Sequence, residues 1–102
     1  MAKDEFIYQR EGPEPIMRAF LHVLQGLLAK KGFQKTIERM DPDGPDSYVF
    51  EKGDLMVSVT LAQRGPGTLL MTVNSGAPIN ETINEAIEAF VEGIRIILKP
   101  TV

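Results

Sequence analysis

The sequence predicts an α+β domain, a four- to five-stranded antiparallel meander with two amphipathic helices on one face, in the order β-α-β-β-β-β-α. Between Leu55 and Asn74, apolar residues alternate with polar or small ones on both sides of Gly65-Pro66-Gly67, as in a β-hairpin. The stretches 14–31 and 79–99 instead carry apolar residues at helical spacing. At 102 residues the chain has the size of one domain, so we treat residues 1–102 as a single domain.

The first element is expected at Phe6, Ile7 and Tyr8, a β-prone run flanked by charge and stopped by Gly12-Pro13. We expect a strand at a sheet edge. A loosely attached arm is the alternative.

Glu14-Pro15 opens the first helix, because proline in the first turn lacks only an N–H that would have been unpaired anyway. Gly32 supplies the left-handed residue that commonly follows a helix. The apolar face predicted from the spacing consists of Ile16, Phe20, Val23, Leu24, Leu27 and Leu28.

Four strands are expected next. Residues 33–40 form a polar, exposed strand, and Asp41-Pro42-Asp43-Gly44-Pro45-Asp46 connects it to a strand at Tyr48-Val49-Phe50. Lys52-Gly53-Asp54 turns the chain into Leu55, where the hairpin described above begins. Consecutive strands joined by turn residues predict an antiparallel meander.

The second helix follows Ser75-Gly76-Ala77-Pro78 and is stopped by Pro100. Its acidic side starts at Glu81 and includes Glu85, Glu88 and Glu92. Its apolar stripe consists of Ile79, Ile83, Ala86, Ile87, Phe90, Val91, Ile94 and Leu98.

The two faces of the hairpin differ in character. One face, expected to pack against both helices, carries Leu55, Val57, Val59, Leu61, Leu69, Met71 and Val73. The other carries no charge and consists of Met56, Ser58, Thr60, Ala62, Leu70, Thr72 and Asn74. Depletion of charge is typical of the core of an interface, so we interpret this face as a contact surface. The alternative is a solvated face, since serine and threonine are common in strands.

The element order resembles the single repeat of the TATA-binding-protein-like fold. The likeness lies in the order of elements across nearly the whole chain and in no sequence motif. It implies a sheet whose open face binds nucleic acid, for which basic residues would be expected, whereas the open face predicted here is neutral.

Composition narrows the classes of function. The absence of cysteine excludes disulfides, thiolate metal sites and cysteine nucleophiles. A net charge of -3 and a pI near 5.1 argue against nucleic acid as a partner. No apolar run reaches the roughly 20 residues of a membrane span, and Met1-Ala2-Lys3-Asp4-Glu5 is charged where a secretory signal is apolar. We therefore expect a cytoplasmic location and no membrane association.

No catalytic, cofactor-binding or metal-binding residue is predicted. His22 is the single histidine and lies on the polar side of its helix. Asp41, Asp43 and Asp46 lack the spacing of a calcium loop and are better explained as turn residues. A small basic patch at one end of the molecule, a contact for an acidic partner, would consist of Lys30, Lys31, Lys35 and Arg39.

We therefore predict a noncatalytic interaction module that uses its open sheet face or a sheet edge to form a homodimer or to bind another protein. Two alternatives stay open. One is a dimeric nucleic-acid-binding protein of the TATA-binding-protein-like fold. The other is a carrier of small apolar ligands with a cavity between the C-terminal helix and the sheet.

Overall fold

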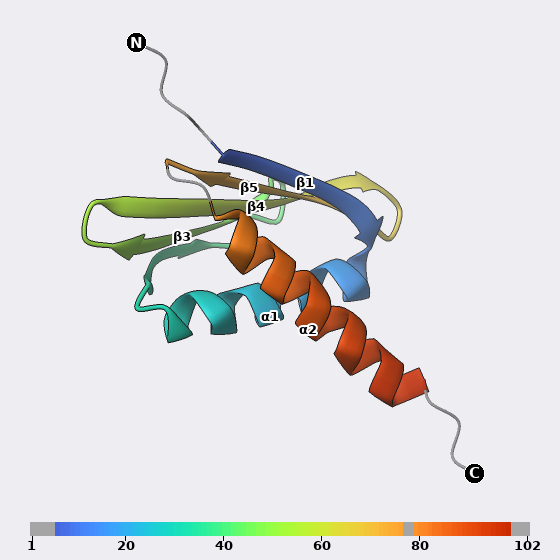
Figure 1. The fold of residues 1–102 in the computed structure, drawn as a ribbon. Coiled ribbons are helices and arrows are strands. Elements are labelled where there is room, and N and C mark those ends of the chain that lie inside the picture. The colour runs from blue at the N-terminus through green and yellow to red at the C-terminus, as the bar shows by residue number, and fades with distance from the viewer. Residues whose placement is uncertain (1–5, 77–78, 99–102) are drawn as a thin grey trace.

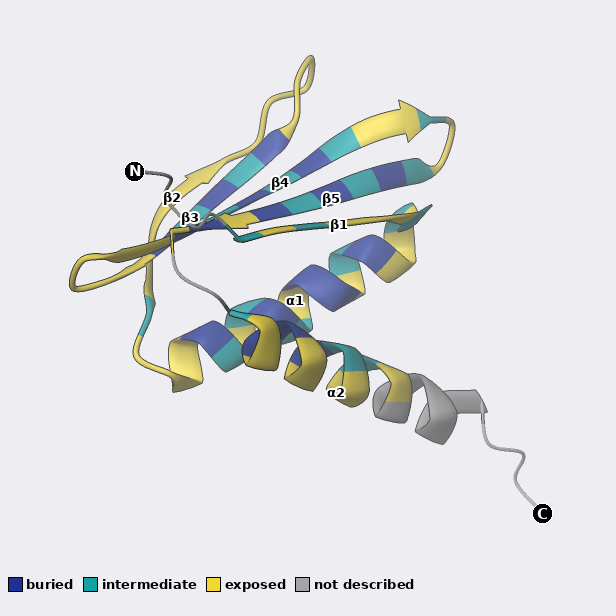
Figure 2. Cartoon of the chain, turned by 45° about the horizontal axis from the view of Figure 1, so that its top comes forward, coloured by how far each residue is buried: buried dark blue, intermediate teal, exposed yellow. Residues whose placement is uncertain are grey.

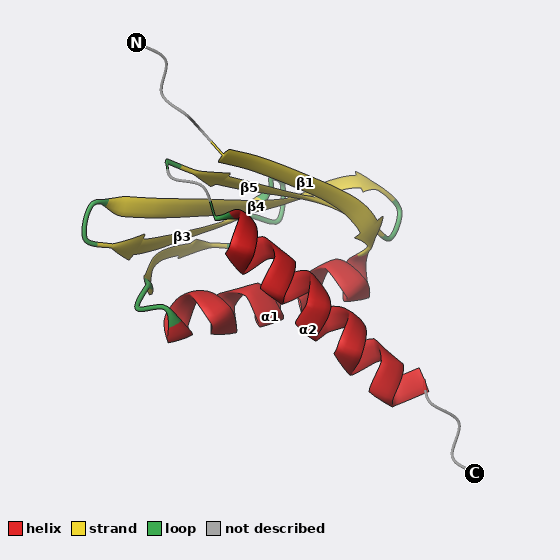
Figure 3. Ribbon diagram, viewed as in Figure 1, coloured by secondary structure: helices red, strands yellow, loops and turns green. Residues whose placement is uncertain are grey.

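The chain folds as a five-stranded antiparallel sheet with two helices, in the order predicted (Figures 1 and 3). The computed structural model describes the backbone of residues 6–76 and 79–98 and the side chains of residues 6–76 and 79–91. The elements are β1 (Phe6–Pro13), α1 (Glu14–Lys30), β2 (Gln34–Arg39), β3 (Asp46–Lys52), β4 (Leu55–Gly65), β5 (Thr68–Ser75) and α2 (Asn80–Leu98). The predicted fold class is thus confirmed.

The strands lie in the order β1-β5-β4-β3-β2, and every neighbouring pair is antiparallel. Strands β2 to β5 form the predicted meander. Strand β1 completes the sheet by pairing with β5, with Tyr8 opposite Val73. The predicted first strand therefore exists, and it lies at an edge.

The end of α1 follows the predicted glycine rule. Gly32 has a φ of 97°, a left-handed conformation that residues with a side chain rarely adopt. Its N–H donates to the Ala29 carbonyl at 3.0 Å, and the N–H of Phe33 donates to the Leu28 carbonyl at 2.9 Å. These two bonds make a Schellman motif, which pairs the last carbonyls of the helix and turns the chain into β2.

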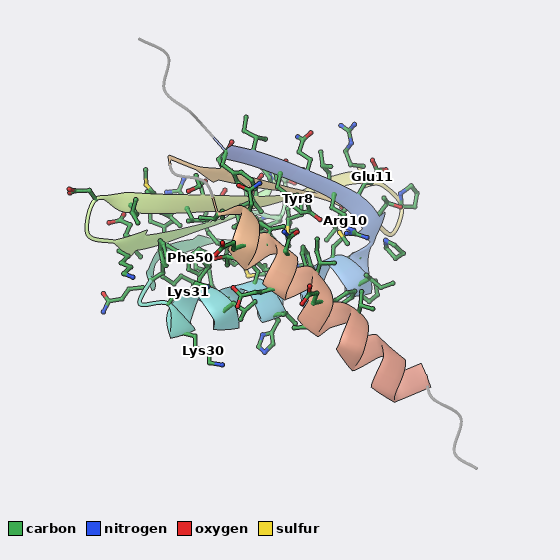
Figure 4. The ribbon with its side chains drawn as sticks, viewed as in Figure 1. Tyr8, Arg10, Glu11, Lys30, Lys31 and Phe50 are labelled. Carbon is green, nitrogen blue, oxygen red and sulfur yellow. The ribbon has the colours of Figure 1, made fainter. Side chains whose placement is uncertain are left out.

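Both helices cover the same face of the sheet, and the core lies between these layers (Figures 1 and 2). Figure 4 shows Phe50 in this interior layer. Helix α2 packs on α1, where the rings of Phe20 and Phe90 meet edge to face with their centroids 5.7 Å apart. The buried apolar residues are Met17, Phe20, Leu21, Leu24, Leu28, Tyr48, Phe50, Val57, Val59, Leu61, Leu69, Met71, Val73, Ile83 and Ala86.

One predicted core residue of the sheet is in fact exposed. Leu55 was expected against the helices, yet 44% of it is accessible. It pairs with Lys52 across the turn that contains Gly53, at the end of the hairpin. Val57, the next residue of β4 on the same side, is fully buried.

The apolar face of α1 is also rotated from the prediction. Ile16 is 40% exposed, whereas Met17 and Leu21, which the prediction left out, are buried beside Phe20 and Leu24. Both sets fit a helical spacing, and packing against the sheet selects the second. In α2, Ile83 and Ala86 are buried as predicted, while Val91 is 45% exposed. The side chains of Glu92, Ile94 and Leu98 lie outside the described residues.

Candidate interaction surface

The sheet face turned away from the helices is the candidate site, and we call it the open face. Directly opposed residues in a sheet share a face, so the strand registers identify its members. All seven residues predicted for this face lie on it: Met56, Ser58, Thr60, Ala62, Leu70, Thr72 and Asn74. The register adds residues from the other three strands: Ile7, Gln9, Glu11, Pro13, Ser47, Val49, Glu51, Gln34, Ile37 and Arg39.

Two rows of opposed residues run across all five strands. The first row consists, from β1 to β2, of Ile7, Asn74, Ser58, Val49 and Ile37. The second consists of Gln9, Thr72, Thr60, Ser47 and Arg39. Small and hydroxylated side chains thus occupy the middle of the face, and larger ones lie at its two sides.

Apolar side chains on this face are poorly covered. Ile7 is 58% exposed, Met56 53% and Ile37 47%. Ala62, Leu70 and Val49 lie among them and are half-buried. Exposed apolar side chains scattered singly are common on proteins, but here they surround one uncharged centre.

The charged residues of the open face lie at its perimeter. Glu11 and Arg39 belong to the two edge strands, and Glu51 lies near the end of β3, where it accepts a hydrogen bond from the Thr36 hydroxyl at 3.2 Å. Inside the perimeter, the Gln9 amide donates to the Thr72 hydroxyl at 3.2 Å. The perimeter carries both signs of charge, so the open face is not a basic surface.

The sheet edges are less suited to pairing with another strand than the face is to packing. Strand β2 is exposed throughout and has an irregular register between Lys35 and Ile37. Strand β1 carries Arg10 and Glu11 at mid-strand, with Arg10 turned to the same side as Tyr8, whose hydroxyl accepts its hydrogen bond at 3.2 Å (Figure 4). Charges and bulges are the features by which natural edge strands avoid pairing.

A hollow of about 350 Å³ lies at another part of the molecule, on the helix side of the sheet. It is lined by Arg18, Met40, Asp41, Pro42, Gly44, Asp46, Leu61, Gln63 and Leu69, which include no residue of α2. An apolar-ligand carrier was expected to have its cavity between α2 and the sheet. The hollow at Arg18 is therefore not the expected cavity.

Arg18 joins α1 to β3 at that hollow. Its Nε lies 3.0 Å from a Glu14 carboxylate oxygen, and its Nη1 lies 3.2 Å from Asp46 Oδ2. The hydrogen bond to Glu14, together with Asp46, raises the pKa of Arg18 above its ordinary value although partial burial opposes this. The Asp46 side chain is only 12% exposed, so this pair holds the start of β3 against the helix.

The three aspartates of the connection from β2 to β3 have separate roles. The Asp41 carboxylate accepts the N–H of Asp43 at 3.0 Å, and its carbonyl accepts the N–H of Gly44 at 3.2 Å. Asp46 turns instead to Arg18. Among the residues that the structure describes, no three His, Cys, Asp or Glu side chains gather as a metal site would require.

The predicted basic patch is largely neutralised by neighbouring acids. Lys31 Nζ lies 2.9 Å from a Glu85 carboxylate oxygen, and Lys35 pairs with Glu38. Lys30 points away from the body of the protein at the end of α1 (Figure 4). His22 is exposed on α1, as its place on the polar side predicted.

The prediction missed the contributions of three strands to the open face. The alternation of Ser47 and Val49 with Tyr48 and Phe50 could have assigned the former pair to this face. The places of Ile7 and Gln9 depend on the pairing of β1 with β5 across more than 60 residues, which no local pattern encodes.

No family model matches the chain, and no curated protein matches it. Within the described residues, no helix is long and apolar enough to cross a membrane.

Proposed function

We propose that this protein is a noncatalytic interaction module that self-associates through the open face of its sheet. The observation that carries the proposal is an uncharged centre formed by β3, β4 and β5, bordered by the exposed apolar side chains of Ile7, Ile37 and Met56. Burying such a centre removes apolar surface from water without desolvating a charge.

The size of the face suits a dimer. Five strands about 4.8 Å apart, each about eight residues long at about 3.3 Å per residue, give roughly 600 Å² in projection. Standard protein interfaces bury about 800 Å² of accessible surface per partner, and the accessible surface of a sheet exceeds its projection. The face is therefore large enough to form a dimer interface of standard size.

A second copy of the chain suits the face in its charge as well. Two copies that approach through an uncharged centre meet no repulsion there, whereas a single-signed face would repel its own copy. Twofold pairing of one patch with itself is the commonest arrangement among protein oligomers.

The test is a charge placed at the middle of the face. Thr60 is half-buried on β4, the central strand, so Thr60→Glu brings two carboxylates into the contact between copies. Such like-charge contacts cost several kcal/mol, and we expect the dimer Kd to rise at least about 100-fold. Analytical ultracentrifugation across a wide range of protein concentrations measures this Kd.

Ala19→Glu is the matched control, because Ala19 is exposed on α1 and lies away from the open face. It adds the same charge and leaves the Kd unchanged. Circular dichroism verifies that both variants stay folded. A wild-type chain that is monomeric at millimolar concentration, or a Thr60→Glu variant that dimerises as well as the control, contradicts the proposal.

A further inference from the structure

We infer that the two copies pack face to face about a twofold axis that runs along β4, which sets Ile7 of one copy against Ile37 of the other. The inference rests on the proposed self-association and adds the geometry of the contact. It follows from the order of the strands, the two rows of the open face and the charges at its perimeter.

The strand order makes β4 the natural axis. Two strands lie on either side of it, β5 and β1 on one side and β3 and β2 on the other. Rotation by 180° about a line along β4 places β1 of one copy over β2 of the other, and β5 over β3. The strands of the two sheets then run in nearly the same direction, as in sandwiches whose sheets pack within about 30° of each other.

This rotation keeps each row over itself and reverses its order. Ile7 and Ile37 lie at opposite ends of the first row, so Ile7 of each copy meets Ile37 of the other. Both are about half exposed in the single chain, and their contact covers them. In the middle of the rows, Ser58 and Thr60 meet their own counterparts and let the sheets approach closely.

The charges at the perimeter complement each other in this arrangement. Arg39 comes to lie over Gln9 of the other copy, at the end of the second row. Glu11 lies two residues farther along β1 on the same face, about 7 Å away, which is within the reach of an arginine side chain. The twofold axis produces this pair twice, once at each side of the interface.

An axis across the strands gives a poorer match. It places β2 over β2 and β1 over β1, so that the two copies of Arg39 approach each other or lie on Ile37. Like charges then meet and apolar side chains face polar ones, which disfavours that arrangement.

Two charge reversals test the axis. The variants Arg39→Glu and Glu11→Arg each place like charges at both pairs of their own dimer, so we expect the Kd of each to rise about tenfold. Mixed together, they form a heterodimer in which both pairs are again opposite in sign. Native mass spectrometry of the mixture, with one variant isotope-labelled, shows the heterodimer in large excess over both homodimers.

The control replaces Glu11→Arg by Glu88→Arg, a reversal of the same charge at an exposed position on α2. Mixed with Arg39→Glu, it gives no preference beyond the statistical one. Since the chain has no cysteine, single cysteines provide a second measurement: a short bismaleimide cross-linker joins Ile7→Cys to Ile37→Cys in a mixture of the two variants, and it joins neither variant to itself.

A statistical mixture of the charge variants, or cross-linking of Ile7→Cys to itself, overturns the axis along β4. If Thr60→Glu still abolishes the dimer in that case, the proposed function stands and only the geometry is wrong. If the wild-type chain does not dimerise at all, the proposed function and the axis both fail.

Discussion

The rotation of α1 relative to its sequence pattern leads to a quantitative prediction about two residues of similar size. Leu21 is 4% exposed and packs in the core, whereas Ile16 is 40% exposed. Replacing a buried leucine by alanine costs about 3 kcal/mol, because the transfer energy is lost and a cavity remains. Ile16→Ala loses only part of that burial and gains about 0.4 kcal/mol of helix propensity, so its net cost is below about 1 kcal/mol.

Urea denaturation followed by circular dichroism measures both variants at one fixed protein concentration, since self-association would otherwise add to the stability. With an m-value of about 1.5 kcal/mol/M, Leu21→Ala lowers the midpoint by about 2 M and Ile16→Ala by less than about 0.7 M. The slopes stay equal to that of the wild type. Equal losses for the two variants would mean that Ile16 belongs to the core, and the described packing of α1 would be wrong.

Two further predictions concern a glycine pair and a tyrosine. Gly32→Ala lowers the free energy of unfolding by about 1–2 kcal/mol, because Gly32 has a left-handed φ and a Cβ there would meet the Lys52 side chain. Gly26 lies in open space on α1, so Gly26→Ala raises the free energy of unfolding by about 0.5–1 kcal/mol. Thermal unfolding should show melting temperatures shifted in opposite directions, and two shifts of the same sign would refute this account. Burial, reinforced by the charge of Asp46, raises the pKa of Tyr48, so the folded state keeps the phenol proton where the unfolded chain loses it. The contribution of Tyr48 to stability is fully present below about pH 10 and is lost as the pH rises through the folded pKa. Denaturation curves should therefore show that the wild type loses more stability than Tyr48→Phe between about pH 9 and 11. Equal losses in the two proteins would contradict this prediction.

The order of elements was predictable from local patterns alone. The alternation in residues 55–74 and the glycine after α1 each act over a few residues, and the structure follows both. The phase of α1 was not predictable in this way, because Ile16 and Met17 each continue a helical stripe. Only the shape of the facing sheet selects Met17, which is 2% exposed.

The open face was predictable in part. Strands β4 and β5 follow from the hairpin pattern, so the seven residues assigned to it lie together on one side. The place of β1 depends instead on its register with the distant β5. The position of Ile37 on this face also requires the irregular register at Thr36, which shifts the alternation of β2 by one residue. A pattern read along β2 alone gives no sign of that shift.

The pairing of β1 with β5 has a consequence for how the chain folds. Strands β2 to β5 join neighbours in sequence and can form as soon as they are made, but β1 has to wait until residues 68–75 exist. Closing so long a loop is slow, since its entropy is lost before any contact is gained. Strand β1 is therefore fixed later than the meander, and until then the outer backbone of β5 is an unprotected template on which a neighbouring chain can add a strand.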